Sequence, residues 1–221
     1  MHRKLEILWG FVVFMFVPIL AMDGLSETTG FHCMTQYSMR LNRWLHGEPR
    51  PTQPPFDLTV LDEEGNEAAY YEPGKIYTIR LVGYVHYRGL LIQPRLCDEH
   101  GFTIGSLRGG RFLEDNNWGL YGLRFQRCSH WNMDDDSVTH ADDDKKFLSV
   151  IKWTTDRDVG NVQFMITIAS EDDVYWERWR PYSGFLQSIS QKVSPSKVIK
   201  EVFVDEKSAF KIYSSSSDAK S

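Results

Sequence analysis

From Phe56 onwards, apolar and polar side chains alternate along the chain, and turn-forming residues interrupt the alternation at short intervals. The first such stretch interleaves Phe56, Leu58 and Val60 with Asp57 and Thr59. Successive side chains of a strand point to opposite faces of a sheet, so a period of two is typical of a strand with one buried face. Because little of the chain shows the period of a helix, we expect an all-β fold.

The same pattern recurs further along the chain. Pro73 and Gly74 predict a type II turn, because glycine readily adopts the positive φ that the third turn position requires. Residues 101–110 are rich in glycine, and we interpret them as a loop. Further strands are expected at residues 77–81, 87–93, 121–128, 147–153, 162–169 and 174–179, the last being the final strand. Seven or so short strands separated by turns predict an antiparallel β-sandwich.

The chain begins with a leader that sets the expected compartment. The basic residues His2-Arg3-Lys4 precede sixteen uncharged residues, 7–22. A bilayer core of about 30 Å needs about 20 residues of helix, so this stretch is short for a membrane span and suits a signal peptide cleaved after Ala21. An uncleaved anchor is the alternative. After cleavage we expect a secreted, extracellular protein with no stable membrane anchor.

Composition shifts divide the chain into three parts. The proline-rich residues 49–55 predict an extended segment that leads into the first strand. Residues 34–45 weakly favour a short helix. The tail loses the alternation except around residues 198–204, so we expect it to be mostly disordered. The predicted parts are a signal peptide (1–21), a β-sandwich domain (22–186) and a polar, flexible C-terminal tail (187–221).

The charge balance excludes one large class of functions. The chain has 25 Lys and Arg residues against 30 Asp and Glu residues, which gives a net charge of −5. Nucleic-acid binding depends on neutralising phosphates with a broad basic face. We therefore expect no nucleic-acid partner.

Seven pieces of the chain, taken in order over about residues 33–180, resemble the Reeler domain. This module stands at the N-terminus of reelin and F-spondin and also occurs in small secreted insect defence proteins. The matching pieces are Pro54-Pro55-Phe56-Asp57-Leu58, the turn and strand from Tyr71 to Leu81, the aromatic-x-Gly strand from Tyr87 to Arg95, Cys128, Val138-Thr139-His140, Phe147 to Trp153, and Gly160 to Phe164.

The resemblance implies an immunoglobulin-like β-sandwich that is extracellular and usually non-enzymatic. It links the chain to matrix adhesion, guidance and innate immunity, including the binding of microbial surfaces. The chain departs from the family because it lacks the cysteines for a second disulfide, which would lie near Asn161 and after the last strand.

Three cysteines by themselves leave three single pairings open. The resemblance implies a disulfide between Cys33 and Cys128. Cys97 then has no partner for a disulfide within the chain. It is either buried and inert, or it links two chains in a disulfide-bonded dimer.

Six aspartates lie within residues 134–144 and flank His140. Calcium prefers such oxygen-rich loops, but no glycine or glutamate stands at calcium-loop spacing, and Lys145 and Lys146 partly neutralise the charge. We favour a solvated acidic loop, with a calcium site as the alternative. His140 is expected to be hydrogen-bonded near a strand rather than to act as a ligand or base. No spacing predicts a metal, a cofactor or a catalytic residue.

An aromatic and basic cluster stands at the end of the expected domain. In a regular strand, Trp176, Arg178 and Arg180 would share one face, with Trp179 on the other. The candidate binding surface is formed by Trp176, Arg178, Trp179, Arg180 and Tyr182. Aromatic residues combined with arginine suit carbohydrate or protein contacts. The alternative is that these residues form the edge of the core.

These observations predict a secreted, non-catalytic binding protein. The role that the resemblance implies is recognition in innate defence or matrix adhesion, with an extracellular protein, a glycan or a microbial surface as partner. One alternative is a structural matrix protein that assembles through Cys97 and the tail. Another is a remnant of a ferric-reductase-type protein, since larger relatives attach this domain to haem-binding and membrane-spanning domains.

Overall fold

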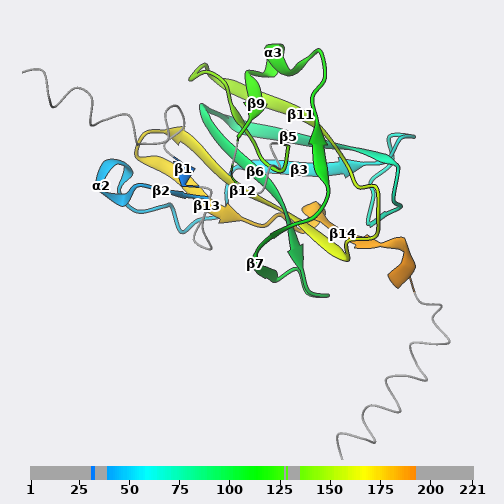
Figure 1. The fold of residues 1–221 in the computed structure, drawn as a ribbon. Coiled ribbons are helices and arrows are strands. Elements are labelled where there is room, and N and C mark those ends of the chain that lie inside the picture. The colour runs from blue at the N-terminus through cyan, green and yellow to red at the C-terminus, as the bar shows by residue number, and fades with distance from the viewer. Residues whose placement is uncertain (1–30, 33–38, 127, 129–134, 193–221) are drawn as a thin grey trace, which may run out of the picture.

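Strands dominate the computed structural model, which describes residues 31–32, 39–126, 128 and 135–192 (Figure 1). The helices in these ranges are single turns. The elements in chain order are β1 (Phe31–His32), β2 (Arg40–Leu41), α2 (Arg43–His46), β3 (Phe56–Leu61), β4 (Tyr70–Tyr71), β5 (Ile76–Tyr87), β6 (Gly89–Cys97), β7 (Thr103–Arg108), β8 (Arg111–Leu113), α3 (Trp118–Tyr121), β9 (Leu123–Phe125), β10 (Val138–His140), β11 (Lys146–Thr154), β12 (Asn161–Glu171), β13 (Val174–Trp179), η1 (Tyr182–Gly184), β14 (Phe185–Ser188) and η2 (Ile189–Gln191).

Two sheets form the sandwich. The larger sheet has the order β4-β14-β12-β6-β10-β9, with β13 also paired to β12 and β7 also paired to β6. The smaller sheet has the order β3-β5-β11-β8, and β1 pairs with β2 separately. The pairs are antiparallel except for β14 and β4, which run parallel with Gln187 opposite Tyr70. The predicted all-β sandwich is confirmed, with one parallel pair that the sequence did not indicate.

The main core lies between the two sheets. The alternation predicted for the first strand is confirmed, because Phe56, Leu58 and Val60 of β3 are each at most 3% exposed. Trp153 of β11 meets Phe164 of β12 edge to face, with ring centroids 5.5 Å apart. Large aromatic rings thus join the two sheets across the core.

The central strands β6 and β12 are buried on both faces. Leu90 and Ile92 of β6 face the main core, whereas Leu91 packs on the opposite face with Met165 of β12 and Met39. The continuous apolar run in β6 predicted a central strand, and the structure confirms it.

The segment before β3 covers this outer face and is attached to β13. Arg43 of α2 donates two hydrogen bonds to Glu177, at 2.7 and 3.2 Å. The hydroxyl of Tyr175 donates to the carbonyl of Gly47 at 2.7 Å. The short helix predicted over residues 34–45 is only partly found, because α2 spans four residues and follows β2; residues 34–38 lie outside the described residues.

The turn prediction is confirmed, and two boundary predictions are wrong. Lys75 N–H bonds the carbonyl of Glu72, and Gly74 has φ +84°. The predicted glycine loop at 101–110 contains the strand β7, because Gly105 at φ +59° lets the chain bulge where the pairing with β6 shifts register. The strand predicted at 121–128 is β9, three residues long and preceded by α3.

The chain also continues beyond the strand predicted to be last. After β13, η1 and the four-residue strand β14 follow, and β14 inserts between β12 and β4. Four residues are too few for alternation to reveal a strand. Residues 187–192, assigned to the tail from sequence, form the end of β14 and η2, whereas residues 193–221 lie outside the described residues.

The predicted signal peptide, residues 1–21, also lies outside the described residues. Within the described ranges, none of the helices combines the length and the apolar character that a membrane crossing requires.

Candidate functional site

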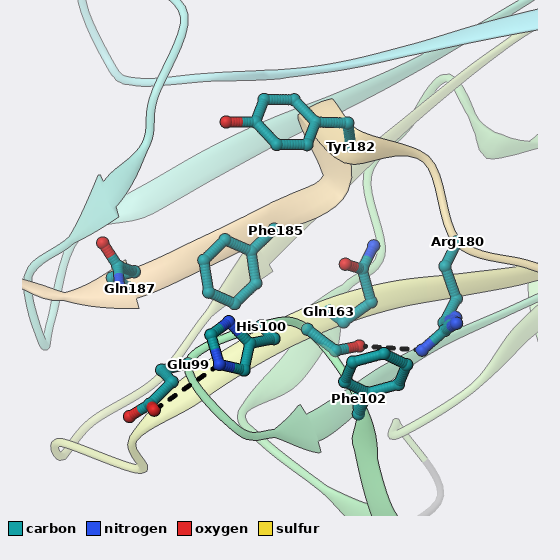
Figure 2. Close-up of a pocket in the computed structure, with 9 residues that line it drawn as sticks. Glu99, His100, Phe102, Gln163, Arg180, Tyr182, Phe185 and Gln187 are labelled. Atoms are coloured by element: carbon teal, nitrogen blue, oxygen red, sulfur yellow. Dashed lines mark hydrogen bonds and ion pairs between the residues drawn. The ribbon is translucent and has the colours of Figure 1, made fainter.

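A groove opens at one end of the larger sheet, where the loop between β6 and β7 faces the segment from Arg180 to Gln187 (Figure 2). Its volume is about 520 Å³. Figure 2 shows Tyr182 and Phe185 on one side, with Glu99, His100 and Phe102 on the other. Gln163 of β12, Arg180 and Gln187 complete the polar lining. The groove therefore combines three aromatic rings with several polar side chains.

The β6–β7 loop is held rigid by Asp98. Its Oδ1 accepts hydrogen bonds from the N–H groups of His100, at 2.9 Å, and Phe102, at 2.8 Å. The backbone N–H of Asp98 bonds the carbonyl of Phe102 in return, at 2.9 Å. Gly101 has φ +77°, a conformation that glycine adopts without strain. This local network fixes Phe102 at the rim, where its ring is 58% exposed.

Arg180 fastens the loop to the opposite wall. Its guanidinium donates to the carbonyl of Gly101 at 3.2 Å and lies 5.0 Å from the centroid of the Phe102 ring (Figure 2). Such a cation–π contact stabilises a partly exposed pair by about 0.5–1 kcal/mol. These two contacts fix the position of the Arg180 side chain on the wall of the groove.

The turn η1 presents Tyr182 outward. Ser183 Oγ donates to the carbonyl of Leu58 in β3, and the N–H of Gly184 bonds the carbonyl of Pro181 at 3.0 Å. Gly184 is buried so closely that an added Cβ would lie 3.1 Å from Leu58 Cδ2. The Pro181 carbonyl accepts a further bond from Gln163 Nε2 at 2.9 Å, so the residues on either side of Tyr182 are both anchored, while Tyr182 itself is 97% exposed.

The floor of the groove is a buried glutamine. Gln163 is 4% exposed, and its Nε2 donates to the carbonyls of Phe164, at 3.1 Å, and Pro181, at 2.9 Å. These bonds fix the orientation of the amide. Its Oε1 accepts no hydrogen bond from the residues that the structure describes, so an acceptor remains available at the floor.

A second hollow of about 430 Å³ lies across Tyr182 from the first. It is formed by β3 and by the chain leading into β4, with Thr59, Glu67 and Ala68 among its lining residues. Tyr182, Phe185 and Gln187 line both hollows. The two hollows therefore form one extended surface with Tyr182 as the ridge between them.

The structure divides the predicted aromatic and basic cluster. Trp176 is 8% exposed and belongs to the main core, and Trp179 packs against that core. Arg178 has φ +53°, and its N–H bonds Thr167 Oγ1 at 3.0 Å. This bulge shifts the pairing with β12, so both tryptophans contact one core, and the expectation that they lie on opposite faces is wrong. Of the five residues, Arg180 and Tyr182 line the groove.

The sequence reasoning missed Phe102, Gln163 and Phe185. Phe102 stands in the segment interpreted as a glycine loop, and Phe185 lies beyond the strand expected to be last. The aromatic residue directly after a glycine in Gly101-Phe102 is a signal that could have pointed to an exposed ring.

Two cysteines can be placed. Cys128 is buried at 1% exposure and is disulfide-bonded. Cys33 lies outside the described residues, so the pairing of Cys33 with Cys128 stays a prediction. Cys97 is free and 5% exposed, and burial raises the pKa of its thiol to about 12. A protonated, buried thiol is a poor nucleophile, which favours the inert alternative for Cys97.

Two of the described aspartates of the acidic loop, Asp136 and Asp142, are engaged by basic side chains. Asp136 is 2% exposed and lies 3.3 Å from Arg108 Nε, and burial raises the pKa of its carboxyl group. Asp142 accepts a hydrogen bond from Lys146 at 2.5 Å, which lowers the pKa of Asp142. Among the described residues, no group of three or more His, Cys, Asp or Glu side chains is arranged to hold a metal ion.

His140 is hydrogen-bonded at the end of β10. Its Nδ1 accepts from the N–H of Leu90 at 3.1 Å. Burial lowers the pKa of His140, so the ring is neutral at pH 7.

Comparison with known proteins agrees with this fold. The sequence model of the Reeler domain matches residues 37–192, more than half of the chain. The chain belongs to the Reeler domain family. The family resemblance inferred from the strand motifs is therefore confirmed. The comparison with curated proteins gives no match.

Solved structures of Reeler domains are similar to this one. The human F-spondin reeler domain (fragment 1) is 17% identical and has a TM-score of 0.47, with 65% of this chain and 94% of that chain covered. Fragment 2 is 15% identical at a TM-score of 0.48, covering 66% and 97%. The Reelin-N domain of F-spondin is 17% identical at a TM-score of 0.42, covering 66% and 86%.

Proposed function

We propose that this protein is a secreted, non-catalytic binding module that recognises an extracellular partner through the groove around Tyr182. The observation that carries the proposal is the presentation of Tyr182, which is 97% exposed between two residues that bond other strands, Pro181 to Gln163 and Ser183 to Leu58. A rigid aromatic side chain offers a large contact area and loses little conformational freedom when it binds. The leader sequence and membership of the Reeler family support an extracellular role in innate defence or matrix adhesion.

An array of glycans and of bacterial and matrix surfaces tests the proposal, with protein purified after expression of the full chain. We expect binding to at least one class of surface. The double variant Phe102→Ala, Tyr182→Ala should lose that binding. Trp44→Ala is the matched control, because Trp44 is also 97% exposed but lies on α2, outside the groove. Absence of binding to every surface, or equal binding by the groove variant, would contradict the proposal.

The structural alternative depends on assembly through Cys97. The burial of this thiol in β6 opposes it, because an intermolecular bond would require the strand to open. The reductase alternative requires a bound haem. Absorption spectra of the purified protein decide that point, and our proposal expects no haem band.

A further inference from the structure

We infer that the groove takes an uncharged oligosaccharide that lies across Tyr182 and occupies both hollows. This inference rests on the proposed binding function and names the chemical class of the ligand. A sugar ring has an apolar C–H face and a rim of hydroxyl groups, so its site needs exposed aromatic rings next to fixed hydrogen-bonding groups. The groove supplies both.

The aromatic groups are spaced along the surface rather than gathered at one point. Phe102 stands on the β6–β7 loop, Tyr182 on η1, and Phe185 at the start of β14 between them (Figure 2). Phe102 is held by Arg180, and Tyr182 by its anchored turn. Pre-positioned rings lower the entropic cost of binding, and this arrangement can stack more than one sugar ring.

The hydrogen-bonding groups are amides. Gln163 Oε1 at the floor is oriented by the two bonds of its Nε2 and accepts no bond from the described part of the chain. Gln187 lines both hollows, and its side chain makes no hydrogen bond with the described residues. An amide offers both donors and acceptors, which matches hydroxyl and acetamide groups of sugars.

The charges lining the groove disfavour a sulfated or otherwise acidic glycan. In the first hollow the carboxylate of Glu99 offsets the positive charge of Arg180. Glu67 adds a negative charge to the second hollow. The whole chain carries a net charge of −5, so it repels polyanions at long range as well. An uncharged oligosaccharide is repelled neither by the carboxylates of the groove nor by the net charge of the protein.

The shared ridge also predicts a dependence on ligand length. Tyr182, Phe185 and Gln187 line both hollows. A ligand that is long enough to fill only one hollow therefore makes no contact with the residues of the other. We expect the affinity for an uncharged oligosaccharide to rise by about tenfold from disaccharide to hexasaccharide, which corresponds to about 1.4 kcal/mol.

Calorimetric titration of the full-chain protein tests the inference, with chitohexaose and cellohexaose as uncharged probes and a heparin-derived hexasaccharide as the charged probe. We expect at least one uncharged probe to bind more tightly than the heparin probe. Tyr182→Ala should weaken that binding about tenfold, which corresponds to about 1.4 kcal/mol, because the variant lacks the ring on which the sugar stacks. Trp44→Ala should bind like the parent protein. Circular dichroism verifies that each variant is folded.

The outcomes separate this inference from the proposed function. Tighter binding of heparin, or uncharged binding that Tyr182→Ala leaves intact, overturns the inference. Failure of both uncharged probes also overturns it, and if groove-dependent binding to a protein or bacterial surface persists on the array, the proposed function stands. Absence of all binding on the array overturns both.

Discussion

His140 illustrates how burial sets the chemistry of a single residue. Its Nδ1 accepts the Leu90 N–H bond, and burial holds its pKa below that of an exposed histidine. The unfolded chain therefore binds a proton at this residue more readily than the folded chain. The stabilising contribution of the neutral ring is present above about pH 6.5 and is lost as the pH falls below that value.

We predict that His140→Asn flattens the pH dependence of stability below pH 6.5. The asparagine Oδ1 can accept the Leu90 N–H bond, and it does not titrate. Relative to the variant, the parent protein should lose up to about 1.4 kcal/mol per pH unit between pH 6.5 and the folded-state pKa. Urea unfolding at pH 7.5 and pH 5.5 measures the difference. Identical losses in the two proteins would show that His140 does not carry this effect.

Arg178 is a residue whose backbone conformation conflicts with its side chain. Its φ of +53° is left-handed, which costs a non-glycine residue about 1–2 kcal/mol. We predict that Arg178→Gly raises the free energy of unfolding by up to about 1 kcal/mol, since glycine adopts this φ without strain. Thermal unfolding measures the change. Arg178→Ala is the control, because it removes the charge near Arg95 and keeps the backbone strain. An equal gain in both variants would assign the effect to charge.

At the scale of elements, the β6–β7 loop shapes the groove through Gly101. An added Cβ there would lie 3.1 Å from Gln163 Oε1, and the φ of +77° would also be strained. Gly105 shares a positive φ, +59°, but has no atom within 4 Å of an added Cβ. A comparison of alanine variants at the two glycines therefore distinguishes the effect of backbone strain from the effect of a contact in the groove.

We predict that Gly101→Ala and Gly105→Ala each lower stability by about 1–2 kcal/mol, and that only Gly101→Ala weakens binding at the groove. Chemical denaturation and calorimetric titration with the oligosaccharide that binds the parent protein provide the two measurements. Weakened binding in both variants would mean that the whole hairpin, rather than the contact with Gln163, governs the groove.

The elements that sequence patterns predicted are those with the longest regular burial. The alternation in β3 and β5 and the apolar run of β6 were predictable, because each strand repeats its buried positions several times. The groove was less predictable, because the strands β7 and β14 are short. In addition, the bulge at Arg178 moves Trp179 to the face of the sheet that contacts the core. Tyr182 and Arg180 were named from the aromatic and basic cluster, but their partners Phe102, on the β6–β7 loop, and Gln163, in β12, are distant in sequence and only the fold brings them together.

At the scale of the whole molecule, the cysteines report on both the fold and the compartment. We predict that a thiol reagent at pH 8 leaves the native protein unlabelled, because Cys97 is buried and its pKa is raised to about 12. Denaturation without a reductant should release one reactive thiol per chain. Mass spectrometry counts the labels. Three labels would exclude the predicted disulfide between Cys33 and Cys128, and a dimer on a non-reducing gel would favour assembly through Cys97.

We propose that the groove beside Tyr182 is the recognition surface of the sandwich. Backbone amide chemical shifts, recorded while chitohexaose or cellohexaose is added to the isotopically labelled protein, test it most directly. We predict that the perturbed amides map to residues 98–102, 180 and 182–187, on the two walls of the groove. Perturbations confined to α2 or to β5, β8 and β11 of the smaller sheet, with the groove amides unchanged, would contradict the claim.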